Sequence, residues 1–218
     1  GVISSAAEAN ALGLYKKEGT NIYKFGAGDV KFVDVNPGEN PGLIDENDKT
    51  VIGDPNPDFY GNIYSSMKYK NWNLDIVCNY SVGNDIYNFY RQQLESGSSF
   101  NNQSTALVNR WVIDGQKTST PKVAFGDPMG NSRFSDRWIE DGSYLRLKTV
   151  KLSYSVPVSY SWLQGLVLWC AAENLCTLTK YDGNDPETSV NNSILYQGID
   201  AGLLPQSKSF HFGVKLNL

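Results

Sequence analysis

The chain has 218 residues and a net charge of −4, so it lacks the basic excess that favours nucleic acids or anionic membrane surfaces. No run of about 18 apolar residues occurs, which excludes a membrane-spanning helix; spanning strands need an apolar residue only at every second position. The first residues, Gly1–Ser5, have neither the basic nor the apolar part of a secretory signal peptide, so none is expected there.

Residues 1–60 show little periodicity. An alanine-rich stretch within residues 5–17 predicts a short helix. Beyond it, glycine and proline recur at short intervals up to Pro57. Because both residues interrupt regular structure, this segment is predicted to be a long ordered loop without a core.

Alternation of apolar and polar residues predicts five strands, at about residues 61–70, 73–86, 143–156, 165–180 and 207–218. The first two are joined so closely, at Asn71–Trp72, that they should form an antiparallel hairpin. In the third strand the apolar residues change phase midway, which predicts a bulge near Thr149. The last strand alternates without a break from Phe210 to Leu218.

The connections between these strands alternate between long and short. Long segments cover residues 1–60, 87–142 and 181–206, whereas the other two connections, 71–72 and 157–165, are short. This alternation is typical of bacterial outer-membrane barrels. Aromatic residues also gather on the short-turn side, as an interfacial girdle would: Tyr69, Trp72, Tyr154, Tyr160 and Trp162. The pattern alone leaves open a soluble β-sandwich that binds carbohydrate and buries the same apolar faces in its own core.

Several stretches, taken together and in order, resemble a known family. They are G-D-V-K-F-V-D-V-N (28–36), L-I-D-E-N-D-K-T-V-I-G-D-P-N-P (43–57), Y-S-V-G-N-D-I-Y-N (80–88), S-D-R-W-I-E-D-G-S-Y-L-R-L-K-T-V-K-L-S-Y-S-V-P (135–157), A-E-N-L-C-T-L-T-K-Y-D-G-N-D-P-E (172–187) and the final strand. These stretches resemble the C-terminal portion of the SusC/RagA family of TonB-dependent outer-membrane transporters. The chain departs from that pattern at Cys176, where the family often has Phe, and at Leu218, where it has an aromatic residue.

The resemblance implies an all-β fold in which residues 1–218 are the C-terminal segment of an antiparallel transmembrane β-barrel. Such a barrel has about 22 strands; this chain would supply about five, with long extracellular loops and short periplasmic turns, and would lack the plug domain. The implied function is TonB-dependent import of an oligosaccharide or peptide across the bacterial outer membrane, without enzymatic activity. The implied partners are a SusD-like surface lipoprotein, the TonB complex acting through the missing plug, and the lipid bilayer, but no nucleic acid.

The acidic segment within residues 34–48 is a candidate calcium site. Asp34, Asn36, Asp45 and Asp48 supply the carboxylate and amide oxygens that a hard cation prefers. The alternative is a loop in which the same side chains form Asx turns with the backbone. No other cofactor is expected.

Four aromatic residues in the predicted loops are candidates for substrate contact, because aromatic rings can stack on sugar rings or line a peptide cavity. They are Trp111, Trp138, Tyr181 and Tyr196. The alternative is that they pack the loops themselves. No catalytic residues are expected: no pair of carboxylates stands out for glycoside hydrolysis, the only histidine, His211, lies in the last strand, and the cysteines have no metal-binding spacing.

Overall fold

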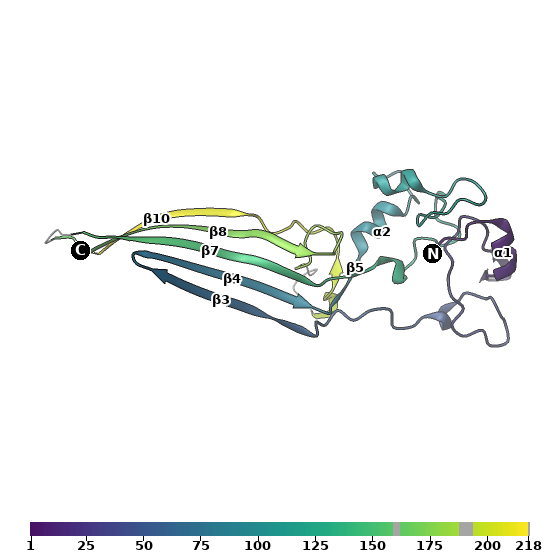
Figure 1. Ribbon diagram of the computed structural model, residues 1–218. Helices are drawn as coiled ribbons and strands as arrows, with labels where there is room; N and C mark the ends of the chain where they lie inside the picture. The colour runs from purple at the N-terminus through teal and green to yellow at the C-terminus, as the bar shows by residue number, and fades with distance from the viewer. Residues whose placement is uncertain (159–161, 188–193, 218) are drawn as a thin grey trace. The chain divides into compact units, whose positions relative to one another are not determined.

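The computed structural model of the protein describes residues 1–158, 162–187 and 194–217 (Figure 1). Two predicted features fall outside these ranges: Tyr160 of the aromatic group, and Leu218 at the end of the last strand. The chain forms two compact units, Gly1–Gly53 with Asn88–Ile139 and Asp54–Tyr87 with Glu140–Leu218. Among the described residues, no helix combines the length and the apolar composition needed to cross a membrane.

The second unit is built around one antiparallel sheet of five long strands (Figure 1). In sheet order these are β10 (Ser209–Asn217), β8 (Gly165–Thr179), β7 (Tyr144–Val156), β4 (Trp72–Val82) and β3 (Phe59–Tyr69). Strands that follow one another along this part of the chain are therefore neighbours in the sheet. A two-residue turn joins β3 to β4, with Lys70 in the left-handed region at φ 52°, and residues 157–164 join β7 to β8. The long connections, 83–143 and 180–208, consequently leave and rejoin the strands at the opposite end of the sheet.

The prediction of one strand over residues 73–86 is wrong at its C-terminal end. β4 stops at Val82, and the chain turns at Gly83, whose φ of +90° a residue with a side chain rarely adopts. The hydroxyl of Ser81 donates a 2.8 Å hydrogen bond to Asn84 Oδ1 across this turn. Ile86 lies in a separate short strand, β5 (Asp85–Asn88), which pairs with β6 (Ile139–Asp141) and β9 (Ile199–Asp200). The apolar alternation continues across the turn, so periodicity alone could not locate it.

The bulge predicted near Thr149 is confirmed at Lys148. Val77 of β4 pairs with Thr149, but the next residue, Cys78, pairs with Leu147, so Lys148 has no partner on β4. The pairing of β7 with β8 shifts at the same point. One extra residue reverses the phase of the side chains that follow it. The bulge therefore keeps the apolar residues of both halves of β7 on one face of the sheet.

The two faces of the five-stranded sheet differ in chemistry, because paired residues project to the same face. The apolar face carries Phe59, Ile63, Met67, Leu74, Ile76, Leu147, Val150, Leu152, Leu168, Phe210, Phe212, Val214 and Leu216. The polar face carries Asn62, Ser66, Lys68, Asn73, Asp75, Asn79, Arg146, Lys151, Ser153, Glu173, His211 and Lys215. On the apolar face, Phe212 is 81% exposed and Val214 62% exposed. Within the described residues of this unit, no second sheet packs over that face.

Aromatic residues lie at the short-turn end of this sheet. Tyr69 pairs with Trp72 across the hairpin, and Trp72 pairs in turn with Tyr154 of β7. The rings of Trp72 and Tyr154 are 4.6 Å apart between centroids, and the ring of Trp162 is well exposed.

The first unit contains a hydrophobic core, so the prediction of a coreless loop over residues 1–60 is wrong. Its apolar residues are scattered in the sequence but converge in space: Ile3, Ala9, Leu14, Phe25 and Ile44. The unit comprises α1 (Ala6–Leu12), β1 (Tyr15–Glu18), β2 (Asn21–Lys24), η1 (Glu46–Asp48), α2 (Phe89–Glu95), η2 (Thr105–Asn109) and η3 (Asp136–Trp138). Ser5 caps the start of α1, and Gly13, with φ 63°, ends it. The glycines and prolines make turns that bring apolar residues together without regular spacing.

Candidate functional site

Three of the four aromatic residues predicted to contact substrate are packed within their own units. Trp138 is 1% exposed, and its indole N–H donates to the carbonyl of Arg133 at 3.0 Å. Trp111 is half-buried and donates to the Ser4 carbonyl at 3.0 Å. Both lie in the first unit.

Tyr181 and Tyr196 lie in the second unit. Tyr181 is 5% exposed, and its hydroxyl donates a 2.6 Å hydrogen bond to Asp200. Tyr196, in η5 (Ile194–Tyr196), is 46% exposed. Of the four aromatic residues, Tyr196 therefore presents the most surface to a solute, and substrate contact by the group stays a prediction.

The acidic segment is organised by hydrogen bonds to its own backbone. Asp48 accepts backbone N–H groups from Val35 and Asp45, each at 2.8 Å, and from Asn36 at 3.2 Å. Burial opposes ionisation of the Asp48 carboxyl, but these hydrogen bonds outweigh it and lower the pKa of Asp48 below its usual value. Asp34 accepts from the Gly42 N–H at 2.7 Å through Oδ2.

These contacts occupy many of the oxygens that a cation would need. The Oδ1 atom of Asp34 is buried and has no hydrogen-bond partner. Over the described ranges, no group of three or more His, Cys, Asp or Glu side chains is placed to hold a metal ion. The backbone-bonded carboxylates match the Asx-turn alternative, and calcium binding through Asp34, Asn36, Asp45 and Asp48 stays a prediction.

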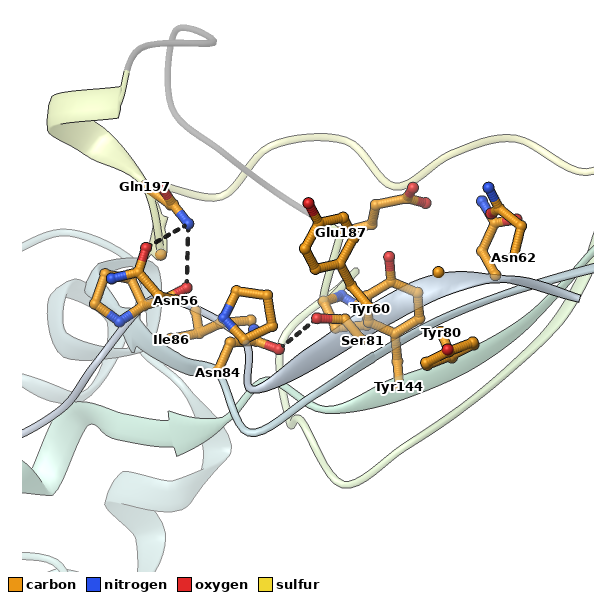
Figure 2. A pocket seen from close by; sticks show the side chains of 16 residues that line it. Asn56, Tyr60, Asn62, Tyr80, Ser81, Asn84, Ile86, Tyr144, Glu187 and Gln197 are labelled. Carbon is orange, nitrogen blue, oxygen red and sulfur yellow. Dashed lines mark hydrogen bonds between the residues drawn. The ribbon is translucent and has the colours of Figure 1, made fainter.

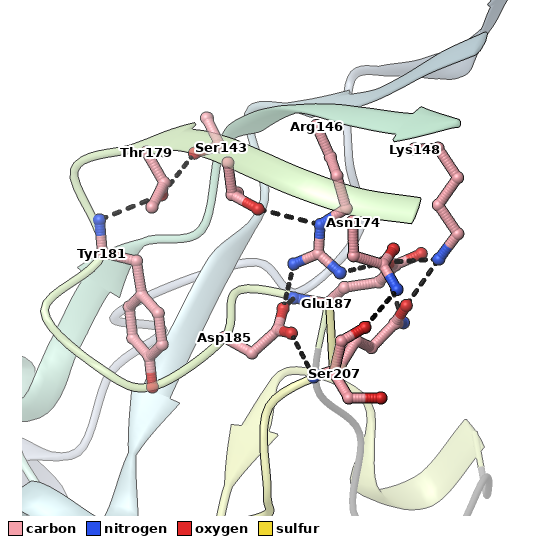
Figure 3. A network of polar contacts seen from close by, with 11 residues as sticks. Ser143, Arg146, Lys148, Asn174, Thr179, Tyr181, Asp185, Glu187 and Ser207 are labelled. Atoms are coloured by element: carbon pink, nitrogen blue, oxygen red, sulfur yellow. Dashed lines mark hydrogen bonds and ion pairs between the residues drawn. The ribbon is translucent and has the colours of Figure 1, made fainter. Parts of the chain in front are cut away.

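A buried ionic network fixes the connection between β8 and β10 to the polar face of the sheet (Figure 3). Arg146 of β7 is 2% exposed; it donates to Thr177 Oγ1 of β8 at 2.9 Å and to Glu187 Oε2 at 2.7 Å, and it pairs with Asp185. The backbone N–H of Gln206 donates to the other oxygen of Asp185 at 3.0 Å. Arg146 and Asp185 thus join both ends of this connection to the sheet.

The electrostatics of this network favour the ionised form of Asp185. Burial raises the pKa of a carboxyl, but the hydrogen bonds from Arg146, Gln206 and Glu187, together with the charge of Arg146, lower the pKa of Asp185 below its usual value. Sequence patterns did not single out Arg146. The available signal was a lone arginine at a polar position of β7, with acidic residues in the following loop.

A cavity of about 760 Å³ opens on the polar face of the sheet, at its long-loop end (Figure 2). The floor comes from residues that pair across β3, β4 and β7: Tyr60, Ser81 and Tyr144 in one row, and Asn62 and Asn79 in the next. The walls come from residues 55–57, Pro186–Glu187 and Gln197–Gly198. Sequence reasoning missed this cavity, because its walls are irregular segments far apart in the chain.

No family model matches the sequence. The chain is 33% identical over 183 residues to TonB-dependent receptor P3 of Formosa agariphila, a match that covers 80% of the chain and 18% of that receptor. It is 29% identical over 191 residues to TonB-dependent receptor SusC of Bacteroides thetaiotaomicron, covering 85% of the chain and 17% of the relative. The solved structure of the RagAB peptide importer in its closed-closed state superposes with a TM-score of 0.70 at 25% identity, over 89% of this chain and 24% of that one. The chain belongs to the SusC/RagA group of TonB-dependent receptors.

The SusC/RagA-type receptors matched here are much longer than this chain. The chain spans less than a fifth of each of the two receptors and about a quarter of the solved RagAB chain. The names of these relatives describe receptors and an importer, which is consistent with a protein that transports rather than catalyses.

Proposed function

We propose that this chain is the C-terminal part of a TonB-dependent β-barrel that imports an oligosaccharide or peptide across the bacterial outer membrane. One observation carries the proposal: a continuous apolar face that runs across all five long strands and that no other part of its unit covers in the described structure. A face of this kind needs an apolar medium outside the protein. The acyl chains of a bilayer provide that medium for a barrel wall.

The polar face would then line the hydrated interior of the barrel. Charged residues lie on it throughout its length, including Arg146, Lys151, Glu173 and Lys215. Under this assignment the short turns face the periplasm and the long connections face the cell exterior. The proposed partners are a SusD-like surface lipoprotein at the exterior and the TonB complex, which would act through a plug domain outside this chain.

The β-sandwich alternative lacks structural support. A sandwich buries the apolar face of one sheet against a second sheet about 10 Å away. In the described part of the second unit, the remaining sheet has only the three short strands β5, β6 and β9. Val214 and Leu216 remain 62% and 57% exposed.

Two adjacent positions on β10 test the proposal directly. In a background with the three native cysteines replaced by alanine, Val214→Cys and Lys215→Cys would each be labelled with a polarity-sensitive fluorophore, in protein reconstituted into lipid vesicles. We expect blue-shifted emission and quenching by lipid-borne nitroxides at position 214, because this face meets acyl chains. The fluorophore at position 215, on the opposite face, should show the emission expected in water. Equal emission at the two positions would contradict the proposal.

A further inference from the structure

The cavity on the polar face has an unusually uniform chemistry. Apart from Tyr80, whose side chain projects to the apolar face by its pairing with Leu145, its lining provides hydroxyl and amide groups, which can each donate and accept hydrogen bonds: Tyr60, Tyr144, Ser81, Asn56, Asn62, Asn79, Asn84 and Gln197. Three prolines and one isoleucine supply the remaining side-chain surface apart from Glu187. Such a lining suits a ligand that is rich in hydroxyl groups and also has apolar ring faces.

The one charged side chain of the lining is also already paired with neighbouring residues. Among the described residues that form it there is no lysine, arginine or histidine. Its one carboxylate, Glu187, accepts hydrogen bonds from Arg146 at 2.7 Å and from Gln206 at 3.0 Å. Lys148 lies 3.7 Å from the same oxygen. Because Glu187 is already paired, the cavity offers no free charge to attract or neutralise a charged ligand.

We propose that this cavity binds a segment of a neutral oligosaccharide, with Tyr60 and Tyr144 contacting sugar rings and Asn62 and Asn79 bonding to sugar hydroxyls. The proposal rests on the proposed function, in which the polar face lines the route of an imported nutrient. Sugar hydroxyls can satisfy both the donors and the acceptors of amide side chains, whereas a buried amide left unpaired would weaken binding. Peptides are less suited, since their charged termini and side chains would find no partner there.

Arg146 is a positioning residue in this arrangement. It does not line the cavity, but it holds Glu187, which does. Asp185, which Arg146 also binds, immediately precedes Pro186 of the same wall. Loss of the arginine should therefore loosen the wall without removing any group that touches the ligand.

The test uses the complete encoded protein purified in detergent micelles. It would be exposed to two pools: neutral oligosaccharides of four to eight sugars released from starch, cellulose, xylan and mannan, and a tryptic digest of casein. Retained compounds would be identified by mass spectrometry and their affinities measured by calorimetry. We expect a neutral oligosaccharide to be retained, with its affinity reduced at least tenfold by Tyr60→Ala and by Asn62→Ala.

Lys68→Ala is the matched control, because Lys68 lies on the same strand and face as Asn62 but outside the cavity. Its affinity should stay within twofold of that of the unmodified protein. Retention of peptides alone, retention of neither pool, or unchanged affinity in both cavity variants would overturn the proposal. None of these outcomes alters the fluorescence contrast between positions 214 and 215, so failure of this proposal and failure of the import proposal are distinguishable.

Discussion

The two units of this chain place their apolar residues in opposite ways. In the first unit, Ile3 and Phe25 are 0% and 3% exposed and pack in an internal core. In the second, Phe212 and Val214 belong to a regular strand and are 81% and 62% exposed. The residues that converge inward are irregularly spaced in the sequence, and those that face outward alternate strictly. The alternation identifies an apolar face, and the exposure of that face shows that nothing in the described part of its unit covers it.

Buried polar groups show the complementary difference. In the first unit, Asp29 is 1% exposed and is bonded by Lys122 and Asn131, each at 2.9 Å, so the network joins loops that are far apart in the sequence. In the second unit, Arg146 and Asp185 fasten a loop to one face of a sheet. The first network joins loops within a unit that has a core, whereas the second attaches a loop to the polar face of a sheet.

The largest expected effect comes from removing the arginine of the second network. Arg146→Met should destabilise the attachment of residues 180–187 by about 3–5 kcal/mol, because Asp185 would be left buried without its counter-charge. Hydrogen exchange in detergent micelles would show this as faster exchange in that segment. Arg146→Met combined with Asp185→Asn is the control and should recover much of the protection. Unchanged exchange in the single variant would mean that the network is not a structural attachment.

Equivalent truncations should sharpen the contrast between the units. Ile3→Ala should lower the local unfolding free energy of the first unit by about 2–4 kcal/mol, since it leaves a cavity in a packed core. Val214→Ala should lower the local unfolding free energy of the second unit by less than about 1 kcal/mol in detergent, because detergent chains can fill the space of the lost methyl groups. Exchange rates in peptides from each unit would measure both. Similar losses in the two variants would show that Val214 is packed as a core residue.

A third effect concerns close packing on the polar face. A Cβ atom at Gly213 would lie 2.4 Å from the ring of Trp169, its partner on β8. Gly213→Ala should therefore destabilise the β8–β10 pairing by about 1–3 kcal/mol. Adding Trp169→Leu should relieve the clash, so the double variant would be more stable than the sum of the single effects predicts. Additive losses, measured by urea unfolding in micelles, would contradict this contact.

The pH dependence should follow from Asp185. Its pKa is lowered in the folded state, so the ionised carboxylate stabilises the fold above its ordinary pKa of about 3.9. That contribution is lost as the pH falls through the lowered value. Thermal unfolding between pH 3 and 7 should therefore show a difference between the unmodified protein and Arg146→Met that shrinks below about pH 4. A constant difference would exclude Asp185 as its source.

Sequence patterns predicted the sheet well because its strands are long and one face of it is mostly apolar. They located the bulge at Lys148 within one residue, since a bulge reverses an otherwise regular alternation. They failed at Gly83, where the alternation runs on through a turn, and in the first sixty residues, where the core is assembled by turns.

The candidate site was harder to predict than the sheet. The cavity combines Tyr60, Asn79 and Tyr144 with the walls at Pro186–Glu187 and Gln197–Gly198. The strand register that aligns the floor follows from the alternation, but the walls depend on where irregular loops return to the sheet. A buried pair such as Arg146 and Asp185 sets that return, and nothing in the spacing of the two residues shows that they meet.

The smallest expected effect concerns calcium, which we propose as a ligand of the acidic segment in the first unit. If Asp34, Asn36, Asp45 and Asp48 hold the ion, calcium at about ten times its Kd should raise the local stability of that unit by about 1.4 kcal/mol. The second unit should not respond. Asp34→Asn should abolish the effect, because Asp34 Oδ1 has no hydrogen-bond partner and is the oxygen most available to a cation. Asp182→Asn, in the second unit, serves as the control. Equal exchange rates with calcium and with a chelator would indicate that backbone hydrogen bonds alone hold this segment, as they already hold Asp48.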